Sequence, residues 1–449
     1  PGKTTWRLLL QRLKRVLKLL MRALALVSIW LPVAASGLTV DLLERLPVFP
    51  EEMAAHLRGM WWTVLLKVID LCGPTFIKAA QWASTRQDIF SQEVCKALGK
   101  LHTFTTWRPI RYGEDALDAA FGPSWRQFFE LEDEALGSGC VAQVYKGRFL
   151  AGEHTGEPVA VKVVDPSLKS TVDLDLSLMR GAATLIELLP RLHWLSIYET
   201  VNEFGQLMES QLNLRQEASN LERFRRDFDD DPSLIVPRPL YPWVTDNVLV
   251  EEFKEGKPIS TYFGGDETRQ LARMGLQAFL KMVFVHNFVH GDLHPGNLMV
   301  GRREDTGGPC LVMLDAGIVC ELDQHDRKNF IDLFYAVVVG DGEQAGRLMI
   351  ERARNQRCTD PEGFCQGVNA LVQKARSRGL RLGQIQAGQL LTTMFALCVQ
   401  HEVKLESKFT SVVIAIAVLE GVGRSLDPDC NILQASLPVV AKAGAMYME

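Results

Sequence analysis

The fold of this chain is decided by one stretch, Phe288-Val289-His290-Gly291-Asp292-Leu293-His294-Pro295-Gly296-Asn297-Leu298-Met299-Val300. Asp292 precedes Asn297 by five residues, and Asp315 follows Asn297 by 18 residues in the segment Leu314-Asp315-Ala316-Gly317. Sites that transfer phosphoryl groups use one Asp to orient a hydroxyl group or a water molecule, and an Asn and a second Asp to hold Mg²⁺ against the ATP phosphates. This order and spacing therefore predict that Asp292 orients the acceptor, whereas Asn297 and Asp315 bind Mg²⁺.

A glycine-rich loop and a strand lysine precede that stretch. The pattern G-x-G-x-x-A-x-V, which lets backbone amides come close to phosphate oxygens, is matched by Gly137-Ser138-Gly139-Cys140-Val141-Ala142-Gln143-Val144. The loop alone is weak evidence, because tight β-turns also use glycine. The next expected strand ends in Val159-Ala160-Val161-Lys162, and a lysine there is costly to bury without an anionic partner. We assign nucleotide binding to Gly137, Gly139, Val144, Ala160, Lys162 and Glu252.

Lys162 needs a carboxylate partner from a helix behind its strand. The best candidate is Glu217, which we expect at the centre of a helix in Gln211-Leu212-Asn213-Leu214-Arg215-Gln216-Glu217-Ala218-Ser219-Asn220. The alternative is an ordinary solvated charge on that helix. Lys162 and Glu217 are 55 residues apart, more than a short connection needs, so we expect extra helices between them. Lys162, Glu217 and Asp292 form the expected catalytic set.

The composition excludes disordered and nucleic-acid-binding classes of protein. The chain has 449 residues, of which 47% are hydrophobic, enough for a large core in more than one subdomain. Residues 1–22 hold seven of the 49 Lys and Arg residues and no acid, whereas the other 427 residues hold 42 basic and 54 acidic side chains. Non-specific binding of nucleic acid needs a basic surface, so we expect no nucleic-acid partner.

The spacing of cysteine and histidine predicts no zinc site. The nine cysteines form no C-x-x-C pair, which is typical of buried thiols in a reducing compartment. His290 and His294 have the i, i+4 spacing of helical zinc ligands, but Gly291, Pro295 and Gly296 argue against a continuous helix. We expect His290 to be a structural hydrogen-bonding residue of the loop.

A basic head and an uncharged segment begin the chain. As a helix, the 18 uncharged residues from Ala23 to Val40 would extend about 27 Å, slightly less than a hydrocarbon core of about 30 Å. Pro32 and Gly37 weaken a spanning helix, so a membrane span, an interfacial helix and a core helix of the next domain all stay open. In the spanning case the basic head would stay on the matrix or cytoplasmic face, and its composition also fits an import signal. The start at Pro1 in place of Met is typical of a trimmed or truncated chain.

Hydrophobic periodicity changes from helical to strand-like and back along the chain. We expect helices in residues 41–130, a hairpin of 141–149 and 159–164, helices in 168–189 and 198–228, a strand in 248–253, a helix in 268–287, a strand in 311–314, and mostly helices to about 432. This mixture of segregated strands and helices predicts an α+β fold.

Together these motifs resemble the aarF-domain-containing kinases, the UbiB (ABC1) family of atypical kinases, from about residue 60 to residue 432. The pattern H-G-D-x-H-P-G-N is highly specific. The other shared motifs are Lys78-Ala79-Ala80-Gln81, the glycine loop, Val159 to Lys162, Glu217-Ala218-Ser219-Asn220, Asp315-Ala316-Gly317, and Leu419-Glu420-Gly421 to Leu426-Asp427-Pro428. The resemblance implies an atypical, two-lobed protein-kinase-like fold that uses ATP and Mg²⁺, with a helical N-terminal extension and a candidate membrane helix. It also implies a mitochondrial, membrane-associated protein linked to coenzyme Q and lipid metabolism, with membrane lipids and coenzyme Q biosynthesis proteins as partners.

By the same resemblance, Lys78 and Gln81 belong to a regulatory extension that folds over the active site and obstructs a peptide-sized substrate. The sequence after Asp315 agrees, because it has no A-P-E motif and no long activation loop before the helix expected from Glu321. A small or lipid-like substrate, or plain ATP hydrolysis, is therefore favoured over protein phosphorylation.

Four departures from the family pattern bear on activity. They are Ala80 for the glycine of K-x-G-Q, Gly137 and Gly139 in a loop that is usually alanine-rich, Gln211 and Asn213 for two acids, and Ala316 for the phenylalanine of D-F-G. The metal-binding carboxylate is kept, whereas the aromatic side chain that helps to lock the active arrangement is lost. A pseudokinase scaffold is therefore the alternative to an ATP-dependent enzyme.

We divide the chain into five parts. These are the basic head and candidate membrane helix (1–40), the helical extension (41–130), the kinase-like N-lobe with a helical insertion (131–256), the kinase-like C-lobe (257–432) and a C-terminal tail (433–449).

Overall fold

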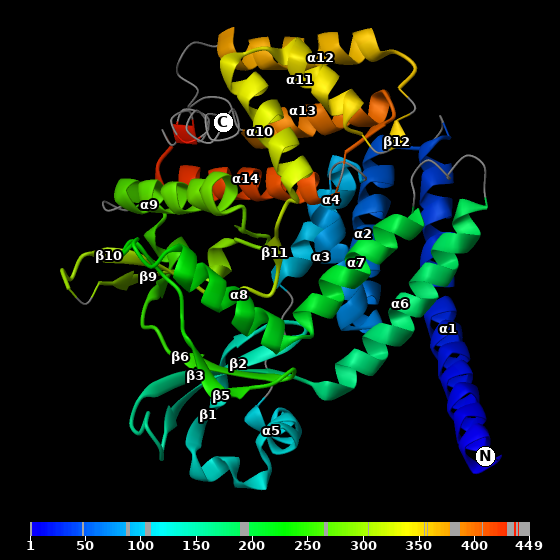
Figure 1. Ribbon diagram of the computed structural model, residues 1–449. Helices are drawn as coiled ribbons and strands as arrows, with labels where there is room; N and C mark the ends of the chain where they lie inside the picture. Colours follow the sequence, from blue (N-terminus) through cyan, green and yellow to red (C-terminus); the bar gives the residue numbers. More distant parts are fainter. Residues whose placement is uncertain are drawn as a thin grey trace.

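The expected α+β fold with two lobes and a helical N-terminal extension is confirmed (Figure 1). The computed structural model describes residues 2–46, 49–86, 90–103, 109–188, 197–264, 268–303, 305–353, 355–356, 358–377, 387–405, 407–428, 435–436 and 439. The expected C-terminal tail lies mostly outside the described residues.

The N-lobe is built on a five-stranded antiparallel sheet with the order β1-β2-β3-β6-β5. Its strands are β1 (Phe129–Ser138), β2 (Ala142–Phe149), β3 (Pro158–Val164), β5 (Pro239–Val244) and β6 (Val248–Glu252). The expected hairpin of β2 and β3 is present, and the glycine loop joins β1 to β2.

The two faces of this sheet have different neighbours. One face packs into a cluster that includes Trp125, Phe129, Val159, Val161, Val248 and Val250. Because successive side chains of a strand point to opposite faces, Ala160 and Lys162 of β3 and Leu249 and Glu251 of β6 point the other way. Leu249 packs there with Leu221 of the helix α8 (Leu214–Asp227). The second face therefore looks toward α8 and the C-lobe.

The N-lobe begins earlier in the chain than expected. Helix α5 (Glu114–Phe121) and the turn η3 (Pro123–Gln127) contribute Leu117 and Trp125 to the cluster on the first face of the sheet. We expected these residues in the helical extension, but burial of their apolar side chains attaches them to the N-lobe sheet.

The extra helices expected between Lys162 and Glu217 are α6 (Pro166–Glu187) and α7 (Ile197–Gln211). The helical segment expected over residues 198–228 is divided into two helices, because α7 ends at Gln211 and α8 begins at Leu214. Asn213 caps α8, since its side chain accepts a hydrogen bond from the Gln216 amide at 3.3 Å.

The C-lobe is mainly helical around a four-stranded sheet with the order β4-β10-β9-β7. Its elements are β4 (Leu234–Ile235), β7 (Lys257–Pro258), η5 (Ile259–Tyr262), α9 (Thr268–Leu280), the π-helical turn η6 (Lys281–His286), β8 (Val289–His290), η7 (Pro295–Asn297), β9 (Leu298–Arg302), β10 (Pro309–Met313), β11 (Val319–Cys320), α10 (Gln324–Val339), α11 (Gly342–Glu351), β12 (Asn355–Gln356), α12 (Pro361–Ser377), α13 (Ala387–Gln400), β13 (Val403–Lys404) and α14 (Ser407–Leu426). Only β11 lies between Asp315 and the start of α10, so this described segment contains no long activation loop.

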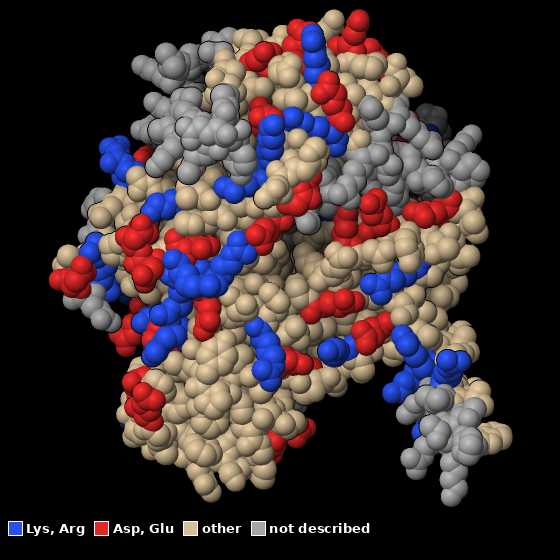
Figure 2. All heavy atoms as spheres, viewed as in Figure 1, with Lys and Arg blue, Asp and Glu red and all other residues tan. Residues whose placement is uncertain are grey.

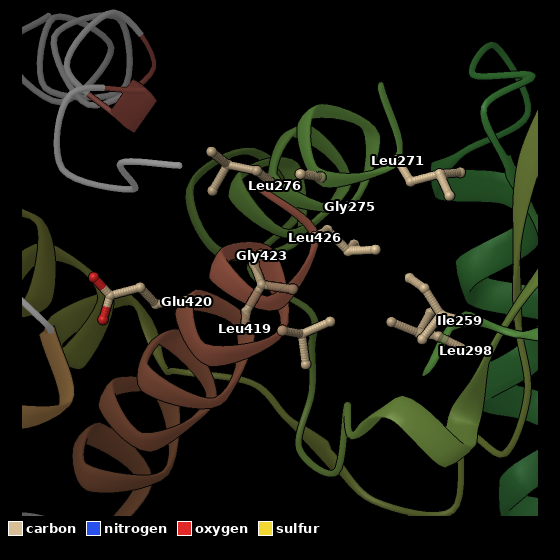
Figure 3. Close-up of a pocket in the computed structure, with 11 residues that line it drawn as sticks. Ile259, Leu271, Gly275, Leu276, Leu298, Leu419, Glu420, Gly423 and Leu426 are labelled. Carbon is tan, nitrogen blue, oxygen red and sulfur yellow. The ribbon is translucent and has the colours of Figure 1, made fainter. Parts of the chain in front are cut away.

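A small apolar pocket lies inside the C-lobe (Figure 3). It is lined mainly by α9 and α14, with Ile259 and Leu298 closing one side. Glu420 is the charged residue of the lining, and Figure 3 shows its carboxylate pointing away from the apolar side chains. The lining contains none of the side chains assigned to catalysis.

The N-terminal extension is formed by α1 (Gly2–Glu44), α2 (Glu51–Cys72), α3 (Pro74–Thr85), α4 (Gln92–Leu98) and the turns η1 (Gly99–Thr103) and η2 (Ile110–Tyr112). Val33 of α1 packs with Leu65 and Leu66 of α2 in the extension's core. Arg22 binds α6, since its Nε lies 2.7 Å from Oδ1 of Asp175. Figure 1 shows α1 running beside α6 and projecting beyond the lobes at its N-terminal end.

Two described helices are long and apolar enough to cross a membrane. Arg12–Glu44 within α1 is 11% buried over its most apolar window, and Phe409–Leu426 within α14 is 50% buried. Val412 and Leu419 of α14 pack into the main core, so α14 has the environment of a core helix.

Candidate active site

Three of the assigned side chains meet at Lys162. Its Nζ lies 2.7 Å from Oε1 of Glu217 and 3.0 Å from Oδ2 of Asp315. The three residues come from β3, the first turn of α8 and the segment after β10. The side chains of Lys162 and Glu217 are 11% and 4% exposed, whereas that of Asp315 is 44% exposed. Asp315 is therefore the partner that a ligand can reach.

The charges of these groups support one another. Burial opposes the charge on Lys162, but Asp315 and Glu217 outweigh burial and hold the pKa of Lys162 above its usual value. Burial also opposes the charge on Asp315, but Lys162 and the Gly317 amide hold its pKa below the usual range. Burial raises the pKa of Glu217, and Lys162 counteracts that rise. Lys162 stays a cation that both carboxylates hold in place.

The position of Glu217 follows from the start of α8. We expected Glu217 at the centre of a helix, but the Asn213 cap places it in the first turn. A carboxylate is favoured there, because the free backbone N–H groups give a helix N-terminus a partial positive charge. Asn213 and Gln211 stand at the two positions where the family pattern has acids. Asn213 caps α8, whereas Oε1 of Gln211 is buried without a hydrogen-bond partner.

A buried histidine joins the two catalytic segments. His290 donates through Nε2 to the Asp315 carbonyl, and its Nδ1 accepts from the Asp292 amide at 3.1 Å. Burial lowers the pKa of His290, which favours the neutral ring that this pattern needs. Asn297 donates through Nδ2 to the Asp292 carbonyl at 2.9 Å. Asp292, Asn297 and Asp315 are therefore held in one hydrogen-bonded unit.

The structure agrees with the prediction that His290 is structural. Nδ1 of His294 accepts from the Gly296 amide, within the same loop. Among the described residues no group of three or more His, Cys, Asp or Glu side chains is arranged to hold a metal ion.

The segment Asp315-Ala316-Gly317 is tied to α8. Asn220 of α8 donates through Nδ2 to the Ala316 carbonyl at 2.8 Å, and the Ala316 side chain is fully buried in the main core. Asp315 has φ of 53°, a conformation that a non-glycine residue rarely adopts, and its Oδ1 accepts from the Gly317 amide at 3.0 Å. Such strain persists only where the surroundings hold it, and here those contacts aim the carboxylate at Lys162.

The glycine loop lies against the N-terminal extension. Sγ of Cys140, in the loop, lies 3.9 Å from Oε1 of Gln81 in α3, and Gln81 also donates to the Leu101 carbonyl at 3.1 Å. Burial raises the pKa of the Cys140 thiol, Lys78 opposes that rise and Asp292 adds to it. The contact between Gln81 and Cys140 therefore places α3 of the extension against the glycine loop.

The other residues assigned to nucleotide binding lie around this centre. Val144 is opposite Lys162 in the β2–β3 register. A Cβ atom added at Gly137 would meet no atom within 4 Å, so this position faces open space. Glu252 contacts Arg238 and Lys254 with its side chain. The nucleotide-binding roles of Gly137, Gly139, Val144, Ala160 and Glu252 stay predictions.

The donor set suits Mg²⁺. Magnesium prefers oxygen ligands, and Asp315 offers a carboxylate while Asn297 retains its amide oxygen, since its hydrogen bond to Asp292 uses the amide nitrogen. Oδ2 of Asp315 already faces a cation in Lys162. The residues present therefore fit a magnesium ion.

Sequence comparison finds two family models in the chain. Residues 108–349 match the ABC1 atypical kinase-like domain, and residues 374–431 match the UbiB helical domain. The mitochondrial ABC1 family protein YPL109C of Saccharomyces cerevisiae is 33% identical over 448 residues, covering 86% of this chain and 68% of that protein. The Dictyostelium discoideum protein named probable serine/threonine-protein kinase abkC is 30% identical over 487 residues, covering 93% of this chain and 70% of that protein.

A solved structure supports the fold. The complex of Rv3197 with erythromycin, from Mycobacterium tuberculosis, has a TM-score of 0.53 and 19% sequence identity. It covers 84% of this chain and 94% of that chain.

Proposed function

Because this chain belongs to the ABC1 atypical kinase-like family, we propose that it binds Mg·ATP between its lobes and transfers the terminal phosphoryl group to a small or lipid-like acceptor or to water. The observation that carries this proposal is the position of Lys162, held between the buried Glu217 and the accessible Asp315. A lysine fixed in this way is a cationic site for phosphate oxygens.

Each remaining residue has one task in this proposal. The amides of the loop at Gly137 and Gly139 approach the phosphates from above. Asp292 accepts a hydrogen bond from the acceptor hydroxyl or water and orients it, since its backbone is fixed by His290 and Asn297. Asn297 and Asp315 would hold Mg²⁺, which neutralises phosphate charge when bound.

The surroundings of the site favour a small acceptor. Gln81 of α3 contacts the glycine loop at Cys140, so the extension stands where a bound peptide would approach. Helix α10 begins at Gln324, soon after Asp315, which leaves no long segment on which a peptide could dock. Lipid chemistry and a link to coenzyme Q metabolism in the mitochondrion fit this geometry, the family membership and the mitochondrial relative.

Helix α1 supports a location on a membrane surface. Leu10, Leu17, Leu24, Leu31 and Leu38 recur every seven residues and are all exposed. They form one stripe, because seven residues make nearly two helical turns. The stripe runs for about 42 Å, longer than a bilayer core of about 30 Å.

The opposite face of α1 is attached to the protein. Leu26 and Val33 are buried on it, and Trp61 of α2 donates to the Val33 carbonyl at 3.0 Å. A helix packed along one side fits an interfacial orientation better than a span. Figure 2 shows Lys and Arg side chains gathered on the projecting end of α1, which suits anionic lipids of a mitochondrial membrane as the partner.

A vesicle assay tests the membrane part. We expect the protein to co-sediment with anionic vesicles and to be released by alkaline carbonate, as an interfacial helix is. A Leu17→Ser, Leu24→Ser, Leu31→Ser variant should lose binding, whereas Leu185→Ser, at an exposed position on α6, should keep it. Resistance to carbonate, or equal binding by both variants, contradicts the interfacial orientation.

A second candidate function is a pseudokinase scaffold that binds nucleotide or lipid without phosphoryl transfer, with coenzyme Q biosynthesis proteins as its partners. Ala316 and Gln211, whose Oε1 atom is buried without a hydrogen-bond partner, favour it, because both remove features of the family pattern. Turnover of Mg·ATP by purified protein, with and without lipid, decides between the two. The enzyme predicts turnover that Asp315→Asn abolishes, whereas the scaffold predicts a melting temperature raised by Mg·ATP without turnover.

A further inference from the structure

Glu251, a buried acid on β6, has no role in the nucleotide site proposed around Lys162. Glu251 is 8% exposed and lies opposite Ala160 in the β3–β6 register. By strand alternation it shares the cleft-facing side of the sheet with Ala160 and Lys162. Its carboxyl group makes no hydrogen bond or ion pair with the residues that the structure describes. Its oxygens are not among the fully buried polar atoms that lack a partner, so they remain open to solvent and a ligand can reach them.

The position of Glu251 points to the base end of a nucleotide. Lys162 marks the phosphate end of the cleft, and Ala160 lies two residues earlier on the same face of β3, about 7 Å along the strand. Glu251, opposite Ala160, therefore stands on the back wall, away from the glycine loop.

Four charged groups act on Glu251 from the elements around it. They are Lys162 of β3, Glu217 of α8, Asp315 after β10 and Glu252 of β6 itself. Burial and the repulsion of Glu217, Asp315 and Glu252 raise the pKa of Glu251 to about 8, whereas Lys162 opposes that rise. At neutral pH the side chain is a carboxylic acid, with one O–H donor and one C=O acceptor.

We propose that Glu251 reads the base of the bound nucleotide, with its O–H donating to N7 of adenine and its C=O accepting from the 6-amino group. Adenine offers this acceptor and donor side by side, and glutamine side chains read adenine in the same bidentate way. Guanine presents two acceptors, N7 and O6, so it leaves the C=O of Glu251 without a donor. The inference rests on the proposed nucleotide site and adds a preference for ATP over GTP.

Two substitutions at position 251 separate this role from a packing role. Glu251→Gln keeps a donor and an acceptor in nearly the same places, whereas Glu251→Leu removes both and keeps much of the volume. Glu132→Gln, at an exposed position on β1, is the matched control. The dissociation constants of Mg·ATP and Mg·GTP are measured by calorimetry on each folded full-length variant.

We expect the wild type, Glu132→Gln and Glu251→Gln to prefer ATP. In Glu251→Leu the ratio of the two constants should fall by about 5- to 150-fold, the discrimination expected of one bidentate pair. An unchanged ratio in Glu251→Leu, with ATP still bound, overturns the role of Glu251 and leaves the proposed function intact. Failure of the folded wild type to bind either nucleotide overturns the proposed function itself.

A pH series gives a second test that does not depend on the leucine variant folding. Above about pH 8 the wild-type acid loses its proton and can no longer donate to N7, so its affinity for Mg·ATP should decline. Glu251→Gln does not titrate and should keep its affinity for Mg·ATP over the same range. A ratio of the wild-type and Glu251→Gln dissociation constants for Mg·ATP that is constant from about pH 6.5 to 9.5 overturns the proposal.

Discussion

Replacing Lys162 by Met should destabilise the protein mainly through Glu217. The Glu217 side chain is 4% exposed and would lose its ammonium partner at 2.7 Å. Removing one member of a buried ion pair typically costs about 3–5 kcal/mol, because the remaining charge is left unpaired. Asp315 should add little, because its side chain is 44% exposed and water can solvate it.

The loss should depend on pH. Burial already raises the pKa of Glu217, so without Lys162 this carboxyl takes up a proton in weakly acidic solution. The destabilisation by Lys162→Met should therefore be about 3 kcal/mol at about pH 6. It should grow by at most about 1.4 kcal/mol for each pH unit above pH 6. Urea denaturation of the wild type and the variant, followed by circular dichroism, measures this difference.

A double-mutant cycle provides the control. When Glu217→Gln is combined with Lys162→Met, no buried charge is left unpaired, and the double variant should recover at least about 2 kcal/mol relative to additivity. A coupling below about 0.5 kcal/mol would refute the argument that the two side chains form one buried pair.

Three further predictions concern other parts of the structure. The free energy of unfolding should fall as pH rises from about 5 to 8, because burial raises the pKa of Glu251 to about 8 and the folded state holds a proton that the unfolded state releases. Glu251→Gln should flatten this pH dependence when unfolding by urea is measured across the range. Equal slopes for the wild type and the variant would contradict this prediction. Arg22→Met should lower the free energy of unfolding by about 3–5 kcal/mol, since the Asp175 side chain is 1% exposed and loses its partner. Adding Asp175→Asn should restore part of the lost stability in thermal melting. A double variant that is no more stable than Arg22→Met would argue against a buried pair. Ala316→Phe, which restores the family's aromatic residue, should destabilise the folded protein by about 1–3 kcal/mol, because the Ala316 side chain is fully buried in a packed core. A melting temperature above that of the wild type would show that the core has room for the ring.

The sequence predicted the parts of the site that short segments define. Asp292, Asn297, Lys162 and Asp315 lie in motifs whose spacing is tied to phosphoryl-transfer chemistry, and the fold brings Lys162 within 3.0 Å of Asp315. The extra helices before Glu217 also followed from the length of that connection.

One local feature was misread although the sequence carried a signal for it. Asn213 followed three residues later by Gln216 is the pattern of a helix start, and it would have placed Glu217 in a first turn. The assignment of Glu252 to nucleotide binding stays a prediction, and strand alternation from Lys162 and its register partner Leu249 places the preceding residue, Glu251, on the cleft-facing side.

Other features depend on contacts that no local pattern encodes. Arg22 and Asp175 are 153 residues apart, and neither residue type identifies the other as its partner. We expected Trp125 in the helical extension, but its side chain is buried against the N-lobe sheet, whose strands come later in the sequence. Such pairings follow from tertiary packing, which overrides local preference.

In the proposed function, one cavity between the lobes holds a nucleotide against Lys162, Asn297 and Asp315. A crystal structure of the full chain with Mg²⁺ and a non-hydrolysable ATP analogue tests it most directly. We expect phosphate oxygens within hydrogen-bond distance of Nζ of Lys162 and a metal ion coordinated by Asn297 and Asp315. A nucleotide bound elsewhere, or a metal ion that touches neither residue, would contradict it.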